Sequence, residues 1–250
     1  MVGIGPGDQA HLSHGAAEEL ASAGVIVGYR TYLQLLKEIL PPGGLTLGSG
    51  MRQEVERARL AVAQALAGHR VVVVSSGDAG VYGMAGLVLE VLLGTGRQSE
   101  VDFRVVPGIT AASAAAALLG APLMHDFAVI SLSDLLTPWE VIKRRIEAAA
   151  WGDFVVVFYN PKSRRRVTQI EEAREVLLGH RKPDTPVGVV TGAGRSGQQV
   201  VLSDLERFLS VEIDMQSVVL VGNSQSYIRD GFMVTPRGYH IEKWDAGSGK

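Results

Sequence analysis

The sequence has 250 residues, of which 46% are hydrophobic and 20% are charged, so it can form one large or two modest globular domains. Its formal net charge of -2 creates no overall field that would attract nucleic acid or an anionic membrane, so an anionic ligand must meet a local patch of cations. The absence of cysteine excludes disulfides, thiolate nucleophiles and thiolate-bound metals, and it fits a reducing compartment.

Short β-branched runs alternate with helical patterns along the chain. Continuous apolar runs suit strands that are covered on both faces of a sheet, with helices as the crossovers between them. With 30 glycines in no fixed period, this pattern indicates an α/β fold with many tight strand-to-helix turns. The predicted strands are a short N-terminal strand and residues 25–27, 71–74, 103–106, 128–132, 154–158, 187–190 and 218–221. The predicted helices are residues 54–66, 86–93, 141–149 and 170–178.

The chain shows no membrane or export segment, and it shows one clear internal boundary. The most apolar segment, residues 110–124, is shorter than the roughly 20 residues that span a membrane, so it is predicted to be a buried helix. No basic segment followed by an apolar run is found at the start, so a cytoplasmic location is expected. The break at Gly120-Ala121-Pro122 predicts domains 1–120 and 121–250, and the polar tail 246–250 is expected to be frayed.

The first motif is the glycine-proline loop, residues 3–8 (GIGPGD), which follows the N-terminal strand. Its glycines do not keep the G-x-G-x-x-G spacing of dinucleotide-binding loops, and the second strand ends in Gly28-Tyr29 instead of an acid that would bind a ribose. Asp8 either caps the following helix or belongs to a substrate loop.

The second motif is the glycine-aspartate turn, residues 75–83 (SSGDAGVYG), directly after the strand at 71–74. Its three glycines expose backbone amides and carbonyls to a flat ligand, and Asp78 can accept hydrogen bonds from hydroxyl groups. The structural alternative is a sharp turn in which Asp78 caps the next helix.

The third motif, residues 106–113 (VPGITAAS), opens an alanine-rich helix. Small side chains allow a ligand to approach the helix start closely, where Thr110 can act as a cap or as a ligand contact. Capping alone would explain Thr110, so the functional interpretation depends on the other glycine turns.

The fourth motif, the basic segment 158–166 (FYNPKSRRR), is predicted to lie at a helix start. Four cations at that position oppose the helix dipole, so an anionic ligand is expected to compensate them. Lys162 and Arg164 can bind substrate carboxylates through charge-assisted hydrogen bonds, whereas a nucleic-acid site would need interleaved aromatic residues.

The histidines give weaker signals. His125 precedes Asp126, and the two form either an acid/base pair or a structural pair. His11 and His14 lie three residues apart without a third ligand, so no metal site is predicted. The sequence has no signature loop of a serine hydrolase, a kinase or a zinc protease.

Three of these motifs occur in the order found in the cobalamin-pathway tetrapyrrole methylases: the G-x-G-P-G-D start, Gly77-Asp78, and residues 107–111 (PGITA). On these motifs the chain resembles that family along nearly its whole length. Residues 75–84, 125–134 and 158–163 resemble the precorrin-3B (cobalt-factor III) C17-methyltransferase branch. Ala79, where many members of the family carry proline, fits this branch.

The resemblance implies two α/β domains of the tetrapyrrole methylase type, with S-adenosylmethionine in the cleft between them, and a homodimer. By matching position it implies cofactor contacts at Pro6, Ser76, Gly77, Asp78, Val81, Tyr82, Thr110, Ala111, Asn160, Ala193, Ser217 and Val218. Substrate contacts are expected at Gly7, Arg52, Lys162 and Arg164. The candidates for proton transfer are Asp8, His125 and Asp126, with Asp78 and Tyr82 as further candidates.

The implied reaction is methylation of C17 of precorrin-3B or cobalt-factor III, accompanied by ring contraction and leaving S-adenosylhomocysteine. Because the sulfonium already activates the methyl group, the protein mainly aligns the two partners. The substrate is a tetrapyrrole with or without cobalt. The alternatives are methylation at C11 or C20 or on a protein histidine, a macrocycle-binding module without chemistry, and a nicotinamide oxidoreductase, which the glycine spacing disfavours.

Overall fold

The computed structural model describes residues 1–40 and 43–239, and the chain forms two compact units. Unit 1 contains Met1–Ala115 and Gly192–Gln199, and unit 2 contains Ala116–Thr191 and the chain from Val200 onward. The chain therefore returns to unit 1 late in the sequence, and we call Gly192–Gln199 the return segment. The tail predicted to be frayed, residues 246–250, lies outside the described residues.

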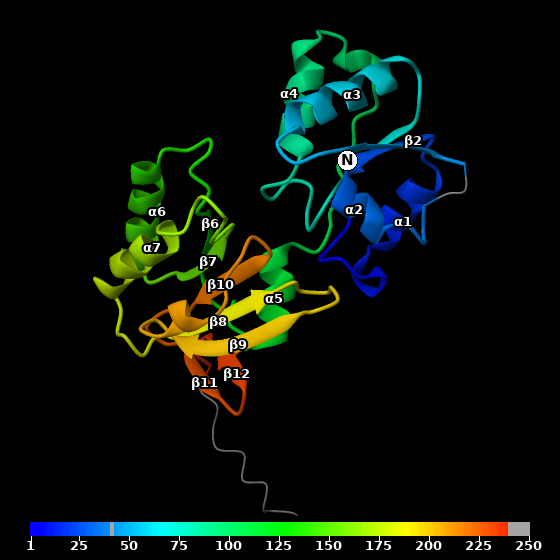
Figure 1. The fold of residues 1–250 in the computed structure, drawn as a ribbon. Helices are drawn as coiled ribbons and strands as arrows, with labels where there is room; N and C mark the ends of the chain where they lie inside the picture. The colour runs from blue at the N-terminus through cyan, green and yellow to red at the C-terminus, as the bar shows by residue number, and fades with distance from the viewer. Residues whose placement is uncertain (41–42, 240–250) are drawn as a thin grey trace, which may run out of the picture. The chain divides into compact units, whose positions relative to one another are not determined.

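Unit 1 is built on a parallel sheet of four strands (Figure 1). Every neighbouring pair of strands is parallel. The carboxyl ends of the strands therefore share one edge, where the loops that follow them meet. In spatial order the strands are β1 (Val2–Gly3), β4 (Val71–Ser75), β2 (Val25–Tyr29) and β3 (Leu45–Ser49).

Helices cover both faces of this sheet (Figure 1). Val72 and Val74 of β4 pack with α1 and α2, whereas Val73 packs with α3 and α4. Successive side chains of a strand point to opposite faces, so a run of consecutive valines supplies both cores. The helical elements of unit 1 are η1 (Gln9–His11), α1 (His14–Ala21), α2 (Arg30–Leu35), α3 (Glu54–Leu66), α4 (Ala85–Gly94) and η2 (Gln98–Glu100).

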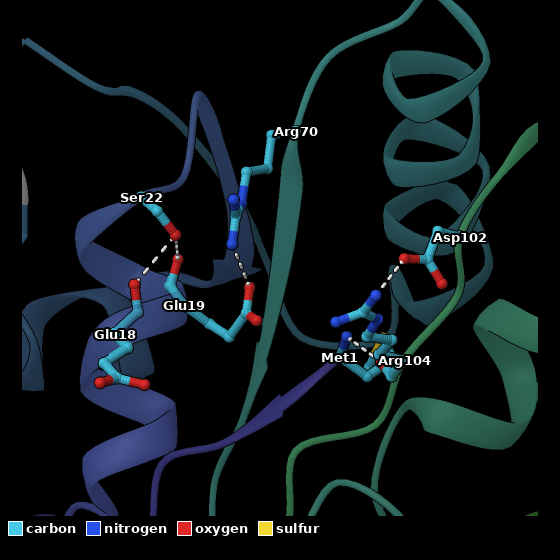
Figure 2. Close-up of polar contacts among 7 residues, drawn as sticks. All are labelled: Met1, Glu18, Glu19, Ser22, Arg70, Asp102 and Arg104. Atoms are coloured by element: carbon cyan, nitrogen blue, oxygen red, sulfur yellow. Dashed lines mark hydrogen bonds and ion pairs between the residues drawn. The ribbon is translucent and has the colours of Figure 1, made fainter.

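Polar contacts close the amino end of the unit 1 sheet (Figure 2). Arg70, just before β4, forms an ion pair with Glu19 of α1, with 2.9 Å between Nη2 and Oε2. The Met1 ammonium donates a hydrogen bond to the Arg104 carbonyl oxygen (2.7 Å), and the Arg104 side chain pairs with Asp102 (2.6 Å). These ion pairs are accessible to solvent and add little stability, so the apolar cores hold the unit together.

Unit 2 contains a mixed sheet of five strands and a small sheet of three. In the larger sheet β6 and β7 are parallel, and β10 is antiparallel to both β7 and β8. The ends of β7 and β8 therefore lie at the same edge as the start of β10. In spatial order the larger sheet is β6 (Phe127–Ser131), β7 (Val155–Tyr159), β10 (Ser217–Val221), β8 (Pro186–Thr191) and β9 (Gln199–Asp204), and the smaller is β11 (Tyr227–Arg229), β12 (Phe232–Val234) and β5 (Gly120–Ala121).

Different helices pack on the two faces of the larger sheet. Val156 and Phe158 share a core cluster with α6 (Trp139–Trp151) and α7 (Gln169–Leu178), which lie side by side (Figure 1). On the other face, Leu119 at the end of α5 packs so closely on Gly188 that an added Cβ there would overlap Leu119 Cδ1. Helix α5 spans Ala111–Leu119, and a 3-10 turn, η3, spans Phe208–Ser210. Within residues 1–40 and 43–239, no helix combines the length and the apolar character needed to cross a bilayer.

The structure confirms the α/β class and most of the predicted elements, including the helix at 54–66 with those bounds. Two predictions are wrong. Residues 103–106 form no strand, because β1 is only two residues long and Val106 alone bridges it, opposite Val2. The helix predicted at 110–124 ends at Leu119, because Gly120 takes a φ of +123° and enters β5.

Gly28→Ala should destabilise unit 1. A Cβ on Gly28 would overlap Val74 Cγ2 and lie 3.0 Å from Leu33 Cδ2, and overpacking a core costs about 1–3 kcal/mol. Gly86→Ala is the matched control, because Gly86 is an exposed α4 position with no atom within 4 Å, and alanine favours a helix by about 0.5–1 kcal/mol. Urea unfolding measures both variants, and equal stabilities would contradict the packing of β2 on β4.

Candidate active site

Three loops of unit 1 are joined by backbone hydrogen bonds at the carboxyl edge of its sheet. The Gly5 amide donates to the Gly77 carbonyl (3.1 Å), and the Gly77 amide donates to the Gly5 carbonyl (2.8 Å). The Gly3 amide donates to the Val106 carbonyl (3.0 Å). The glycine-proline loop therefore contacts both the glycine-aspartate turn and the third motif.

The close approach of these loops requires glycine. A Cβ added to Gly108 would overlap the Gly77 carbonyl oxygen and lie 2.7 Å from the Gly3 carbonyl group. Gly5 and Gly77 have φ values of +70° and +65°, which lie in the left-handed region that favours glycine. Backbone amides and carbonyls are thus brought together where side chains would keep them apart.

Asp78 ties two of the loops together. Its Oδ1 accepts a hydrogen bond from the Gly80 amide (2.7 Å), and its Oδ2 accepts one from the Gly108 amide (3.0 Å). Asp78 is not a helix cap, because α4 begins at Ala85 with Met84 as its N-cap. The carboxylate instead fixes the spacing of the glycine-aspartate turn and the third motif, and it keeps further acceptor positions for a ligand hydroxyl.

Asp8 caps the 3-10 turn η1 at the end of the glycine-proline loop. Its Oδ1 accepts a hydrogen bond from the His11 amide (2.8 Å), and His11 Nδ1 lies 2.6 Å from the same oxygen. Helix α1 has its own cap, since the Ser13 hydroxyl accepts from the Ala16 amide (3.2 Å). The capping role that the sequence left open for Asp8 therefore applies to η1 and not to α1.

The other predicted residues of unit 1 border the same edge. Val81 and Tyr82 lie in the last part of the glycine-aspartate turn and are 39% and 59% exposed. Thr110 directly precedes α5, and Ala111 is the first residue of that helix. Arg52 is exposed and follows β3, which lies two strands from β4, roughly 10 Å across the sheet. Arg52 is thus the predicted unit 1 residue that lies farthest along the sheet from the joined loops.

The carboxyl end of β2 carries a group that sequence reasoning missed. The rings of Tyr29 and Tyr32 lie edge to face with centroids 5.2 Å apart, and Arg57 Cζ lies 5.9 Å from the Tyr29 centroid. Arg57 is buried and donates to the Ser49 hydroxyl (2.7 Å) and the Gly50 carbonyl (2.9 Å). Burial raises the pKa of the Tyr32 phenol, so it stays protonated at neutral pH. The sequence signal for this group was Tyr29, which occupies the position at the end of the second strand where dinucleotide-binding proteins carry a ribose-binding acid.

In unit 2, predicted contact residues gather at one edge of the larger sheet. Asn160 follows β7 with a φ of +51°, and its Nδ2 donates to the Ser131 hydroxyl at the end of β6 (3.0 Å). Ser217 begins β10 opposite Thr191 at the end of β8, and their hydroxyl oxygens are 2.7 Å apart. Ser217 and Val218 are buried as whole residues, with exposures of 2% and 7%.

The basic segment precedes a helix but does not begin one. Helix α7 starts at Gln169, and its first turn carries Glu171 and Glu172. The prediction of four cations at a helix start is therefore wrong, and the helix dipole demands no anionic ligand there. Lys162 is half-buried and Arg164 is exposed, both in the loop that follows Asn160.

Arg166 of the basic segment is turned inward. Its side chain is only 9% exposed, and its Nη2 donates to the Asn160 carbonyl (2.8 Å). Its own carbonyl accepts from the Ser163 amide (2.8 Å). Burial lowers the pKa of the Arg166 guanidinium. Sequence reasoning placed Arg166 among cations facing a substrate, whereas it fixes the backbone of Asn160.

His125 and Asp126 lie apart from Asn160 within unit 2. They directly precede β6, whereas Ser131, which binds Asn160, ends that strand, so the full length of β6, about 13 Å, lies between the two positions. His125 Nδ1 accepts a hydrogen bond from the Asp126 amide (2.9 Å) and lies 3.9 Å from Asp126 Oδ2. This pair stands at the opposite sheet edge from Asn160.

The return segment brings Ala193 into unit 1. Beside it, Arg195 donates from Nε to the Pro6 carbonyl (2.9 Å) and from Nη2 to the Ser76 hydroxyl (2.9 Å). Ala193, Pro6 and Ser76 are therefore members of the same unit, although they come from opposite ends of the sequence. Sequence reasoning missed Arg195, for which the only signal was a glycine-rich run at residues 190–195.

The chemical groups at these edges are mainly backbone amides and carbonyls, together with cations. Among residues 1–40 and 43–239, no three His, Asp or Glu side chains are grouped so that they could hold a metal ion. Arg57 and Arg195 both donate hydrogen bonds to hydroxyl and carbonyl oxygens of the described residues. Such a set recognises a ligand by shape, by hydrogen bonds and by its negative charges.

Comparison with known proteins relates the chain to enzymes that methylate tetrapyrroles. The profile of the family described as Tetrapyrrole (Corrin/Porphyrin) Methylases matches residues 1–208. A cobalt-factor III methyltransferase of Priestia megaterium is 52% identical over 96% of this chain, which spans only 44% of that protein. A probable cobalt-factor III C(17)-methyltransferase of Salmonella typhimurium is 49% identical over 96% of this chain and 99% of that protein.

Two solved structures share the fold. The crystal structure of the methyltransferase CobJ matches with a TM-score of 0.86 and 38% identity, over 94% of this chain and 98% of that one. A uroporphyrin-III C-methyl transferase from Thermus thermophilus, complexed with S-adenyl homocysteine, matches with a TM-score of 0.64 and 27% identity, over 88% of this chain and 95% of that one. The predicted resemblance and fold class are confirmed, and the chain belongs to the tetrapyrrole (corrin/porphyrin) methylase family.

Proposed function

We propose that the chain is an S-adenosylmethionine-dependent methyltransferase that methylates C17 of precorrin-3B or cobalt-factor III, with contraction of the ring. The observation that carries this proposal is the meeting of three glycine loops at one edge of the unit 1 sheet, joined by the Gly5–Gly77 pair. Similarity to a named C17-methyltransferase over nearly the whole chain supports the choice of substrate and carbon.

The groups at this edge fit S-adenosylmethionine. At Gly108 the Gly77 carbonyl and the Gly3 backbone take the place of a side chain, so the joined loops bring backbone amides and carbonyls, which can bind a nucleoside, close together. The relative complexed with S-adenyl homocysteine supports the same class of ligand. When bound, S-adenosylmethionine supplies a methyl group that its sulfonium activates. We assign the contacts to Pro6, Ser76, Gly77, Asp78, Val81, Tyr82, Thr110, Ala111, Asn160, Ala193, Ser217 and Val218.

We further propose that domains 1–120 and 121–250 enclose the cofactor between them, and that the enzyme is a cytoplasmic homodimer. Each unit gathers its assigned contacts at one edge of its own sheet, represented by Gly77 in unit 1 and Asn160 in unit 2, which gives each unit one candidate edge for the ligand. Ala193 belongs to unit 1 through the return segment, together with the assigned contacts of that unit.

Cations and a glycine provide the proposed contacts with the macrocycle. Lys162 and Arg164 follow Asn160 in an accessible loop, and Arg52 follows β3, so all three can meet acetate and propionate groups. Gly7 is the fourth proposed contact, and the Arg195 stem fills the space that a side chain at Gly7 would take. The substrate is a tetrapyrrole with or without bound cobalt, because the macrocycle itself would hold the metal.

Ring contraction requires proton transfers, for which Asp8, His125 and Asp126 are the proposed groups. Asp8 belongs to the glycine-proline loop and shares its Oδ1 with His11, so it lies among the assigned cofactor contacts of unit 1. Because His125 and Asp126 stand at the opposite sheet edge from Asn160, they would act on a part of the macrocycle distant from that residue.

Transfer of a ¹³C-labelled methyl group tests the proposed function. The chain is incubated with methyl-labelled S-adenosylmethionine and either precorrin-3B or cobalt-factor III, and NMR locates the label in the pigment. We expect the label on C17 of a ring-contracted product. Label on C11 or C20 would assign a different position to this enzyme. Calorimetric binding of both ligands without transfer would indicate a macrocycle-binding module.

Asp78→Asn should loosen the joined loops. The amide keeps one acceptor oxygen, so either the Gly80 or the Gly108 amide loses its partner, at a cost of about 1 kcal/mol. We expect weaker binding of S-adenosylmethionine in calorimetry and a lower free energy of unfolding. Asp102→Asn is the control, because Asp102 forms an accessible ion pair at the other end of the sheet (Figure 2). Unchanged binding would remove Asp78 from the assigned contacts.

Lys162→Glu and Arg164→Glu should each raise KM for the tetrapyrrole. Loss of a charge-assisted hydrogen bond weakens binding roughly tenfold or more, whereas KM for S-adenosylmethionine should stay near the wild-type value. Lys182→Glu is the matched control, because it makes the same charge change in the exposed loop before β8, at the opposite edge of the larger sheet. An equal rise in KM for the tetrapyrrole in all three variants would indicate an effect of net charge instead of a local site.

A further inference from the structure

Arg195 connects the return segment to two of the joined loops. Its Nε donates to the Pro6 carbonyl (2.9 Å) in the glycine-proline loop, and its Nη2 donates to the Ser76 hydroxyl (2.9 Å) in the glycine-aspartate turn. Pro6 and Ser76 are 70 positions apart in the sequence, yet one planar group binds both. A rigid guanidinium therefore fixes the separation of these two acceptors.

The aliphatic part of the Arg195 side chain is also closely packed. A Cβ added to Gly7 would lie 2.7 Å from Arg195 Cγ, so the stem lies directly on the Gly7 backbone. A Cβ added to Gly194 would lie 3.0 Å from both Asp8 Oδ2 and Pro6 Cγ. The return segment and the glycine-proline loop thus contact each other through two glycines that leave no spare room.

The return segment holds Arg195 in place through its own turns. The Arg195 amide donates to the Gly192 carbonyl (2.9 Å), and its carbonyl accepts from the Gln198 amide (3.1 Å). The Gln198 Oε1 also accepts from the Gly194 amide (2.9 Å). The backbone of Arg195 is therefore constrained, which reduces the entropy lost when its Nε and Nη2 donors bind their acceptors.

The charge of Arg195 also reaches the group at the end of β2. The Arg195 guanidinium works against the effect of burial on the pKa of the Tyr32 phenol, which burial raises. Within the described part of the chain, Arg195 forms no ion pair, and the two acceptors given above are neutral. Hydrogen bonds from a charged donor are stronger than neutral ones, so both contacts restrain the loops that carry the acceptors.

We propose that Arg195 is a positioning residue that holds the glycine-proline loop and the glycine-aspartate turn at a fixed spacing, so that both loops present their backbone to the same ligand. This role rests on the proposed function, because it is the spacing of Pro6 and Ser76, two assigned cofactor contacts, that Arg195 sets. Arg195 acts through the loops and does not itself touch the reacting atoms.

Arg195→Met tests this role, because methionine keeps an apolar stem on Gly7 and loses both donors. Without ligand, amide hydrogen exchange at Gly5 and Gly77 should become about tenfold faster, since their paired amides lose an external restraint. KM for S-adenosylmethionine should rise about tenfold or more, and KM for the tetrapyrrole should change much less. Arg195→Lys, which can still reach one acceptor, should fall between methionine and wild type.

Arg174→Met is the matched control. Arg174 is also half-buried and also donates its Nε to a backbone carbonyl, that of Leu205 (3.0 Å), but it belongs to unit 2. It should leave exchange at Gly5 and Gly77 unchanged. Circular dichroism checks that each variant folds, and Arg195→Lys replaces Arg195→Met in the comparison if the latter does not.

Several outcomes would overturn the inference. Unchanged exchange at Gly5 and Gly77 in Arg195→Met would show that Arg195 does not restrain the loops. An effect confined to KM for the tetrapyrrole would make Arg195 a direct substrate contact. Because the exchange measurement needs no ligand, faster exchange in a chain whose wild type transfers no methyl group would refute the proposed function and leave the restraint by Arg195 standing.

Discussion

Backbone lies directly against backbone at the carboxyl edge of the unit 1 sheet, and the candidate site depends on this close approach. Gly108 has no room for a Cβ beside the Gly77 carbonyl and the Gly3 backbone. The reciprocal Gly5–Gly77 hydrogen bonds then fix the first two loops, and Asp78 fixes the third. Because no side chains separate these segments, their amides and carbonyls come close together at one edge of the sheet.

The strands behind these loops supply the rigidity that such an approach needs. In β4, Val72 and Val74 join one core and Val73 joins the other, so the strand is held from both faces up to Ser75. Loops that carry function are positioned best by rigid elements of this kind, because packed interiors resist displacement. The same principle applies in unit 2, where the fully buried strand β7 ends directly before Asn160.

Three buried or half-buried guanidinium groups support the candidate residues from within the protein. Arg57, Arg166 and Arg195 donate to backbone carbonyls, and Arg57 and Arg195 also donate to serine hydroxyls. None of the three forms an ion pair within the described residues, and their hydrogen bonds go instead to uncharged acceptors. Carboxylates of Asp8 and Asp78 lie at the same edge of unit 1, so these guanidinium groups act first by fixing the backbone of the candidate residues.

The sequence by itself determined the features whose signals are local. Continuous apolar runs predicted β2, β4, β6, β7, β8 and β10, because strands covered on both faces need apolar side chains at nearly every position. The glycine motifs located the loops, and their order indicated the family. The edge strands β3 and β9 escaped prediction because many of their residues are accessible to solvent. Only the tertiary structure decided which groups meet: Asp78 with Gly108, 30 positions away, and Arg195 with Ser76, 119 positions away. It also put His125 and Asn160 at opposite sheet edges. These pairings follow from the order and direction of the strands, which no short stretch of sequence specifies.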